Sequence, residues 1–163
     1  PMFEFEMHGG VEELEKMEIE LCEYLGIPVE PLQVKTYEQW GDIFDAKELD
    51  HDHEKTIGRG MITKFPEWTS PFWNMARYDD GTSKKIDVIL GGMETIGSAE
   101  RSTDKAQMRE TFHTISDGGY AQLLYDKFGE ERVEDELDKF LSFDFFPRSG
   151  GGIGMTRIIS ALS

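Results

Sequence analysis

Four glycines near the end of the printed sequence lead directly into an apolar helical pattern over 155–162, and this run restricts how the chain can fold. They are Gly150, Gly151, Gly152 and Gly154. Glycine has no Cβ, so such a segment exposes backbone N–H groups and lets another strand or a ligand approach closely. Arg157 lies about one turn into the expected helix, where its guanidinium would point back toward the glycines and suit a phosphate oxygen. The segment predicts either a nucleotide-binding floor or an ordinary turn with a surface arginine.

A second candidate site lies in the segment IDVILGGMETIGSAER, 86–101. Asp87 and Glu94 are seven residues apart and flank a pair of glycines, and Arg101 follows seven residues later. In an extended strand an odd separation puts two side chains on opposite faces, but a turn or bulge at the glycines can bring both to one side. Two carboxylates facing a phosphate chain make a Mg²⁺ site, because Mg²⁺ takes oxygen ligands shared with substrate phosphates. An ordinary hairpin with solvated charges is the alternative.

The order of the other elements predicts an α+β fold. Residues 2–7 alternate between apolar and acidic side chains, which is typical of a half-buried strand. Residues 11–25 have apolar side chains at helical spacing and stop at Gly26. Further strands are expected at 31–37, 61–66, 70–79 and 86–101, and further helices at 38–44, within 45–60, and at 105–115, 119–128, 131–143 and 155–162. Because the strands do not alternate regularly with helices, we expect one domain with a mixed, mostly antiparallel sheet flanked by helices.

The charge balance and the cysteine count exclude several classes of protein. The chain has 33 acidic and 17 basic residues and a formal net charge of −16, so its surface repels phosphate backbones and should not bind nucleic acid non-specifically. The single cysteine, Cys22, permits neither a disulfide framework nor a cysteine-based zinc site, and fits a cytoplasmic location. No apolar run approaches the ~18 residues of a membrane span, so no membrane partner is expected.

Taken in order, several segments resemble the catalytic core of class II aminoacyl-tRNA synthetases of the aspartyl/asparaginyl type (class IIb). GGGIGMTRI, 150–158, resembles motif 3, a glycine-rich junction between a strand and a helix that carries an arginine for ATP. The opening PMFEFEMHGG resembles the last strand of motif 2. Three segments between them follow the order of that branch, HEK (53–55), FPEWTSPFW (65–73) and DVILGGMETIGSAER (87–101). The resemblance implies that 1–163 is a partial catalytic domain, from the end of motif 2 through motif 3.

The resemblance implies a role for each candidate residue. Arg157 matches the motif 3 arginine that contacts the phosphate tail of ATP. Asp87 and Glu94 match the acidic pair that holds Mg²⁺ and ATP. Arg101 matches the arginine that recognises the side chain of aspartate or asparagine, and Glu4 matches an acidic position near the amino group of that substrate. The floor beneath the nucleotide is matched by Gly150, Gly151, Gly152 and Gly154.

The resemblance also implies an activity, the activation of aspartate or asparagine by ATP with Mg²⁺ as cofactor. The aminoacyl adenylate would then react with tRNA or with ammonia, since the branch includes synthetase-related asparagine synthetases. Met155 and Thr156 replace the apolar residue and the acid that usually precede the motif 3 arginine in tRNA ligases, whereas aspartate–ammonia ligases carry a small hydroxyl residue there. Gly97 favours the asparagine type. The alternatives are a tRNA ligase, an asparagine synthetase, and a non-catalytic protein that binds nucleotide or a partner.

Some parts of the family's catalytic core have no match in the printed sequence. Motif 1, which builds the homodimer interface of the family, is not matched, and the ATP-binding arginine of motif 2 would precede Pro1. We therefore expect a fold that is incomplete at both ends. We also expect little pyrophosphate-exchange activity from the isolated chain, and a tRNA partner only for a full-length protein.

The run DHDHE, 50–54, places two histidines and three acids within five residues. Such a run can bind a metal ion. Two histidines spaced i, i+2 in a polar segment are more typical of a solvated surface, however, and we expect that arrangement here.

Overall fold

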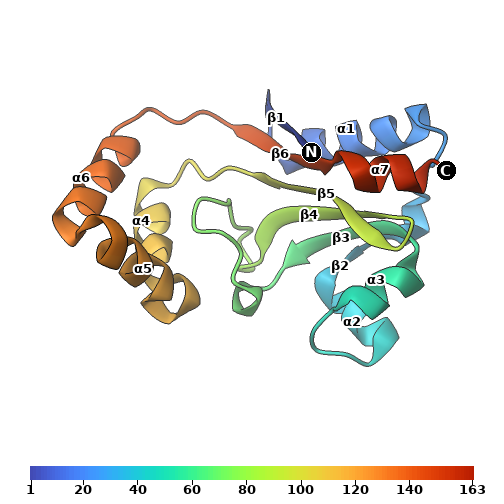
Figure 1. The fold of residues 1–163 in the computed structure, drawn as a ribbon, viewed down its shortest axis with the longest axis horizontal. Coiled ribbons are helices and arrows are strands. Elements are labelled where there is room, and N and C mark those ends of the chain that lie inside the picture. Colours follow the sequence, from blue (N-terminus) through green and yellow to red (C-terminus); the bar gives the residue numbers. More distant parts are fainter.

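The computed structural model describes residues 1–163, which form a single six-stranded sheet with helices around it (Figure 1). The strand order is β1-β6-β5-β4-β3-β2. The strands are β1 Met2–His8, β2 Val34–Thr36, β3 Arg59–Phe65, β4 Ser83–Leu90, β5 Met93–Glu100 and β6 Arg148–Gly154. Neighbouring strands are antiparallel except β2 and β3, which are parallel. The predicted α+β fold with a mixed, mostly antiparallel sheet is confirmed.

The chain has seven α-helices, and polar residues begin several of them. The helices are α1 Val11–Tyr24, α2 Tyr37–Phe44, α3 His51–Ile57, α4 Lys105–Thr114, α5 Gly119–Phe128, α6 Glu130–Leu141 and α7 Met155–Ala161, with 3-10 turns at Pro31–Gln33, Glu67–Thr69 and Ile115–Gly118. The Thr36 hydroxyl accepts a hydrogen bond from the backbone of Gln39 at the start of α2. Asp50 caps α3 in the same way. None of the seven helices has both the length and the apolar composition needed to cross a membrane.

Helices cover both faces of the sheet, with α1 and α7 on one side and α2 and α3 on the other (Figure 1). Leu14 of α1 and Ile158 of α7 share a buried apolar cluster with Val88 of β4. Trp40 of α2 belongs to a second cluster, on the opposite face, with Ile89 of β4. Successive strand residues point to opposite faces, so β4 contributes to both cores and runs through the middle of the molecule.

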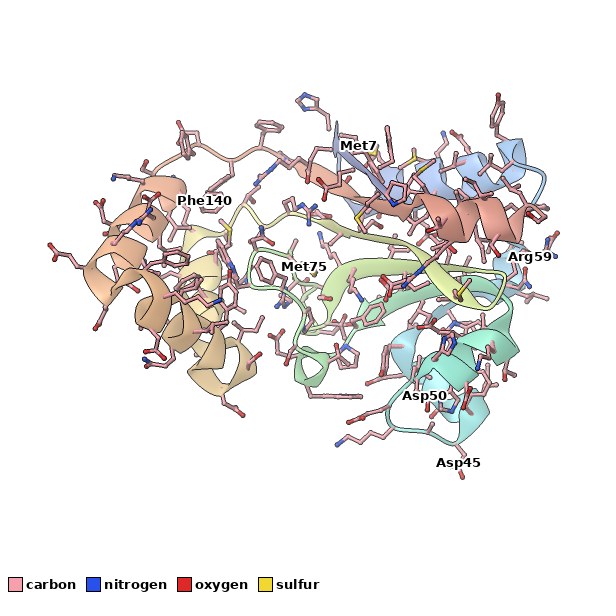
Figure 2. The ribbon with its side chains drawn as sticks, in the orientation of Figure 1. Met7, Asp45, Asp50, Arg59, Met75 and Phe140 are labelled. Atoms are coloured by element: carbon pink, nitrogen blue, oxygen red, sulfur yellow. The ribbon has the colours of Figure 1, made fainter.

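Helices α4, α5 and α6 form a separate group at one end of the sheet, which we call the helical group (Figure 1). Its core contains Trp73, whose ring meets the rings of Phe112 and Phe140 edge-on at centroid distances of 5.4 and 5.6 Å; Figure 2 shows Phe140 within this group. Residues 70–79 are not the strand that the sequence predicts, and they make only isolated bridges to the sheet. That prediction was wrong because Trp73 packs into the helical core instead of standing on a sheet.

The glycine-rich segment forms the strand β6, so the alternative of an ordinary turn was wrong. β6 lies between β1 and β5. A Cβ at position 151 would lie 2.5 Å from the backbone oxygen of Gly97 and 2.5 Å from the Cβ of Ser98. Two neighbouring strands can therefore approach this closely only because residue 151 is glycine.

One carboxyl group is buried in the core between α1 and the sheet. The side chain of Glu18 is inaccessible to solvent, and its Oε1 accepts a hydrogen bond of 2.5 Å from Ser98 Oγ, whereas its Oε2 has no partner. Burial raises the pKa of Glu18 to about 8, despite the opposing effect of the hydrogen bond from Ser98. The folded chain therefore holds this carboxyl group protonated at neutral pH, where the unfolded chain ionises it.

This buried carboxyl group makes the stability of the fold depend on pH. Between the ordinary glutamate pKa of about 4.3 in the unfolded chain and the pKa of about 8 in the folded chain, only the folded state binds the proton. Glu18 therefore lowers the free energy of unfolding by about 1.4 kcal/mol for each pH unit in that window. Glu18→Gln should gain stability relative to the wild type as pH rises, measured by denaturant unfolding at several pH values. A stability difference that does not change with pH would contradict this expectation.

Candidate functional site

Residues from four strands lie in one row across the sheet. Glu4 of β1 lies opposite Gly152 of β6. Gly152 in turn lies opposite Gly97 of β5, and Gly97 lies opposite Asp87 of β4. Residues opposite one another in antiparallel strands point to the same face. The two glycines in the middle of the row therefore form a floor without side chains of its own between two carboxylates.

A cavity of about 470 Å³ lies above one part of this floor. Glu4, Glu6 and Arg101 provide its polar lining, and Gly97 and Gly152 belong to its floor. Arg101 donates hydrogen bonds to Glu6 Oε1 from Nε at 3.0 Å and from Nη2 at 2.8 Å. This charge-assisted pair holds the guanidinium in place. The cavity thus presents a cation and two carboxylates, an arrangement that suits a ligand with both an ammonium group and a carboxylate.

The tight turn between β4 and β5 places the predicted acidic pair on one face. Next to this turn Glu94 pairs with Ile89, which lies two residues from Asp87, so Glu94 faces the same side of the sheet as Asp87. A bulge follows in β5. The pairing of β4 with β5 shifts between Val88 and Ile89, which leaves Thr95 as an extra residue. The extra residue reverses the alternation of side chains along β5. Gly97 consequently lies opposite Asp87 and on the same face as Glu94.

The two carboxylates converge on the space above Gly97. A Cβ at this position would lie 2.6 Å from Glu94 Oε1 and 3.7 Å from Asp87 Oδ1. Asp87 Oδ2 accepts a hydrogen bond of 2.6 Å from Lys85 Nζ, whereas the buried Oδ1 has no partner. Burial raises the pKa of Asp87 against the attraction of Lys85, and the carboxylate of Glu94 raises it further. Asp87 is therefore not a solvated hairpin charge, and a cation above Gly97 would satisfy its unpaired oxygen.

These two carboxylates fit a magnesium ion that shares its other ligands with a substrate. No group of three or more histidine, cysteine, aspartate or glutamate side chains is placed to hold a metal ion by itself. Mg²⁺ commonly binds through one or two carboxylates together with phosphate oxygens and water. Asp87 and Glu94 match that requirement. The run 50–54 instead forms the cap and first turn of α3.

A second cavity, of about 560 Å³, adjoins the first and contains Arg157. The linings of the two cavities share Met2, Gly97 and Gly152. Arg157 Nη1 donates a hydrogen bond of 2.5 Å to the backbone oxygen of Glu94. The guanidinium therefore lies beside the acidic pair, while the residue remains exposed to solvent.

The four glycines of the predicted floor have different surroundings. Gly151 and Gly152 line the cavity of Arg101, and Gly152 and Gly154 line the cavity of Arg157. Gly150 lines neither of these cavities, and a Cβ there would lie 2.6 Å from Glu6 Oε1. Its position leaves room for the carboxylate that holds Arg101.

Known proteins similar to this chain identify its family. The sequence model of the tRNA synthetases class II (D, K and N) matches residues 6–163. The chain belongs to this family. The aspartate–tRNA(Asp/Asn) ligase of Methanosphaera stadtmanae is 26% identical over 153 residues, which cover 85% of this chain and 32% of the relative. A lysine–tRNA ligase of Porphyromonas gingivalis is 22% identical over 69% of this chain and 22% of the relative. The chain thus spans about a third or less of the length of these relatives.

Solved structures of class II synthetases share the fold. The aspartyl tRNA synthetase from Entamoeba histolytica has a TM-score of 0.73 at 17% identity, over 99% of this chain and 40% of that one. The asparaginyl-tRNA synthetase from Pyrococcus horikoshii complexed with asparaginyl-adenylate has a TM-score of 0.72 at 17% identity, over 99% of this chain and 43% of that one. At 17% identity, the similarity to these two structures establishes only the fold of this class II synthetase chain.

Three charged side chains at the site were not predicted from the sequence. Glu6 lies two residues from Glu4, and Lys85 lies two residues from Asp87, so the alternation of a strand puts each of them on the same face as a predicted site residue. Glu54 of α3 is different. Its Oε2 accepts a hydrogen bond of 3.1 Å from the backbone N–H of a residue forty positions later, and no local pattern signals such a contact.

Proposed function

We propose that this chain activates aspartate or asparagine with ATP and forms an aminoacyl adenylate, as the catalytic part of a class II synthetase. The observation that carries the proposal is that two adjoining cavities share one glycine floor. One cavity holds Arg157 next to the acidic pair, and the other holds Arg101 with Glu4. A nucleotide and an amino acid bound in these cavities would meet above Gly97 and Gly152.

ATP would occupy the cavity of Arg157, with its phosphates toward the acidic pair. The Arg157 guanidinium would donate hydrogen bonds to phosphate oxygens at the end of the chain. Asp87 and Glu94 would hold Mg²⁺, which when bound neutralises phosphate charge and orients the phosphates. Gly152 and Gly154 would let the nucleotide lie directly against the sheet.

The amino acid would occupy the cavity of Arg101. The guanidinium keeps donors beyond the two that Glu6 accepts, and these would bind the side chain of aspartate or asparagine. Glu4 would accept hydrogen bonds from the substrate ammonium. Gly97 and Gly152 carry no side chain between the two cavities, and the exposed side chain of Met2 over Gly152 would move aside, so that a substrate carboxylate oxygen can approach the α-phosphorus of ATP. A new O–P bond would form as pyrophosphate leaves, and catalysis would rest on positioning and charge neutralisation.

Two acceptors fit the activated amino acid. The name of the Methanosphaera relative supports tRNA, which reacts with an activated α-carboxylate. Thr156, which lines the nucleotide cavity, supports ammonia, which reacts with an activated β-carboxylate. Incubation of the full-length protein with ATP, ammonia and aspartate distinguishes them, because asparagine formed without tRNA would identify the ammonia ligase.

The space above Gly97 gives a direct test of the nucleotide site. In Gly97→Ala the new Cβ would lie between the two carboxylates and displace a cation that both of them bind. We expect at least about a tenfold loss of Mg²⁺-dependent ATP affinity, equivalent to about 1.4 kcal/mol, in titration calorimetry. The matched control is Gly119→Ala at the start of α5, where the nearest atom to a new Cβ is 3.9 Å away. ATP binding by Gly97→Ala with wild-type affinity would refute the proposed metal position.

The amino-acid cavity is tested separately with a non-hydrolysable aminoacyl-sulfamoyl adenosine. Arg101→Ala removes the only cation that lines this cavity, so binding of the aspartyl or asparaginyl analogue should weaken by at least about tenfold, while ATP affinity stays unchanged. Arg109→Ala in the helical group serves as the control. Equal effects of Arg101→Ala on ATP and on the analogue would show that Arg101 does not recognise the amino acid.

A further inference from the structure

One side chain of the run 50–54 contacts the proposed nucleotide cavity, and it belongs to Glu54. Glu54 Oε2 accepts a hydrogen bond of 3.1 Å from the backbone N–H of Glu94. The two residues are forty positions apart, and the side chain of Glu54 is only 26% exposed. A partly buried carboxylate needs such a donor, because it has exchanged part of its hydration for protein contacts.

The main chain of Glu94 is thus held from two directions. Glu54 accepts from its N–H, and Arg157 donates to its carbonyl oxygen. The turn just before it is also fixed to the end of α3, since the N–H of Gly92 donates to the backbone oxygen of Gly58 at 2.8 Å. These contacts join α3 and α7 to the start of β5, where the bulge interrupts the regular ladder.

The residues before Glu54 explain why the helix lies where it does. Asp50 caps α3 by accepting hydrogen bonds from the backbones of Asp52 and His53; Figure 2 shows it on the side of the sheet that α2 and α3 occupy. The ring of His53 packs on Phe44 of α2 at a centroid distance of 4.8 Å. The run 50–54 therefore fixes the start of α3. Its final residue, Glu54, lies one helical turn after the cap Asp50.

We infer that Glu54 is a positioning residue for Glu94. Its carboxylate fixes the peptide N–H of Glu94 so that the Glu94 side chain faces Asp87 across Gly97, and its consequence for ligand binding rests on the proposed function. The carboxylates of Glu54, Glu94 and Asp87 repel one another. Glu54 is tolerated beside the other two because the peptide N–H of Glu94 offsets part of its negative charge. To position Glu94, the side chain at residue 54 must accept a hydrogen bond, but it does not need a negative charge.

The test compares Glu54→Ala, Glu54→Gln and the control Asp52→Ala, an exposed residue of the same helix. The first readout is hydrogen exchange of the Glu94 amide in the ligand-free chain, followed by NMR. The second is Mg²⁺-dependent ATP affinity. Glu54→Ala should speed exchange of the Glu94 amide by at least about tenfold without affecting Ile86 of the core, and should weaken ATP binding. Glu54→Gln should restore both because its amide oxygen accepts the same hydrogen bond, and Asp52→Ala should alter neither.

Two results would overturn the inference. One is a Glu94 amide that exchanges at the wild-type rate in Glu54→Ala. The other is Glu54→Gln weakening ATP binding as much as Glu54→Ala does, which would make the charge of Glu54 the important property. If the wild type binds no ATP with Mg²⁺, the proposed function fails, but the exchange of the Glu94 amide still decides whether Glu54 positions that residue.

Discussion

The candidate site depends on the contact between two glycines that face each other across β5 and β6. Gly97 and Gly152 are opposite one another in the register of these strands, and each occupies a place where a side chain would block the site. A Cβ at Gly97 would collide with Glu94 Oε1, and one at Gly152 would collide with the side chain of Met2. Because neither glycine carries a side chain, those of Glu94 and Met2 can lie over the sheet here, and the two cavities share a floor.

The charges around this floor bear on which ligand can bind. The chain has a net charge of −16. Five carboxylates lie at the site, those of Glu4, Glu6, Glu54, Asp87 and Glu94, against Lys85 and the two arginines Arg101 and Arg157. One of these two arginines already pairs with Glu6. A polyphosphate would therefore meet net repulsion unless a metal cation accompanied it. This balance supports a nucleotide that binds together with Mg²⁺.

Local patterns in the sequence predicted much of the fold and part of the site. Alternation in 2–7 and helical spacing in 11–25 identify β1 and α1, because both reflect which face of an element is buried. The glycine turn that brings Asp87 and Glu94 to one face was anticipated from their odd spacing, although the sequence did not show the bulge at Thr95 that places Gly97 between them. Residues 70–79 were misassigned because tertiary packing of one tryptophan decided their conformation. The contact of Glu54 with Glu94 depends on how α3 sits against β5, which no pattern in a single segment encodes.

The central claim is that a metal ion and ATP bind together above Gly97, and paramagnetic NMR with Mn²⁺ in place of Mg²⁺ measures this most directly. In the presence of ATP, the backbone amide signals of Asp87, Glu94 and Gly97 are expected to broaden most, while those of the helical group stay sharp. Broadening that centres on 50–54, or that is the same with and without ATP, would contradict the claim.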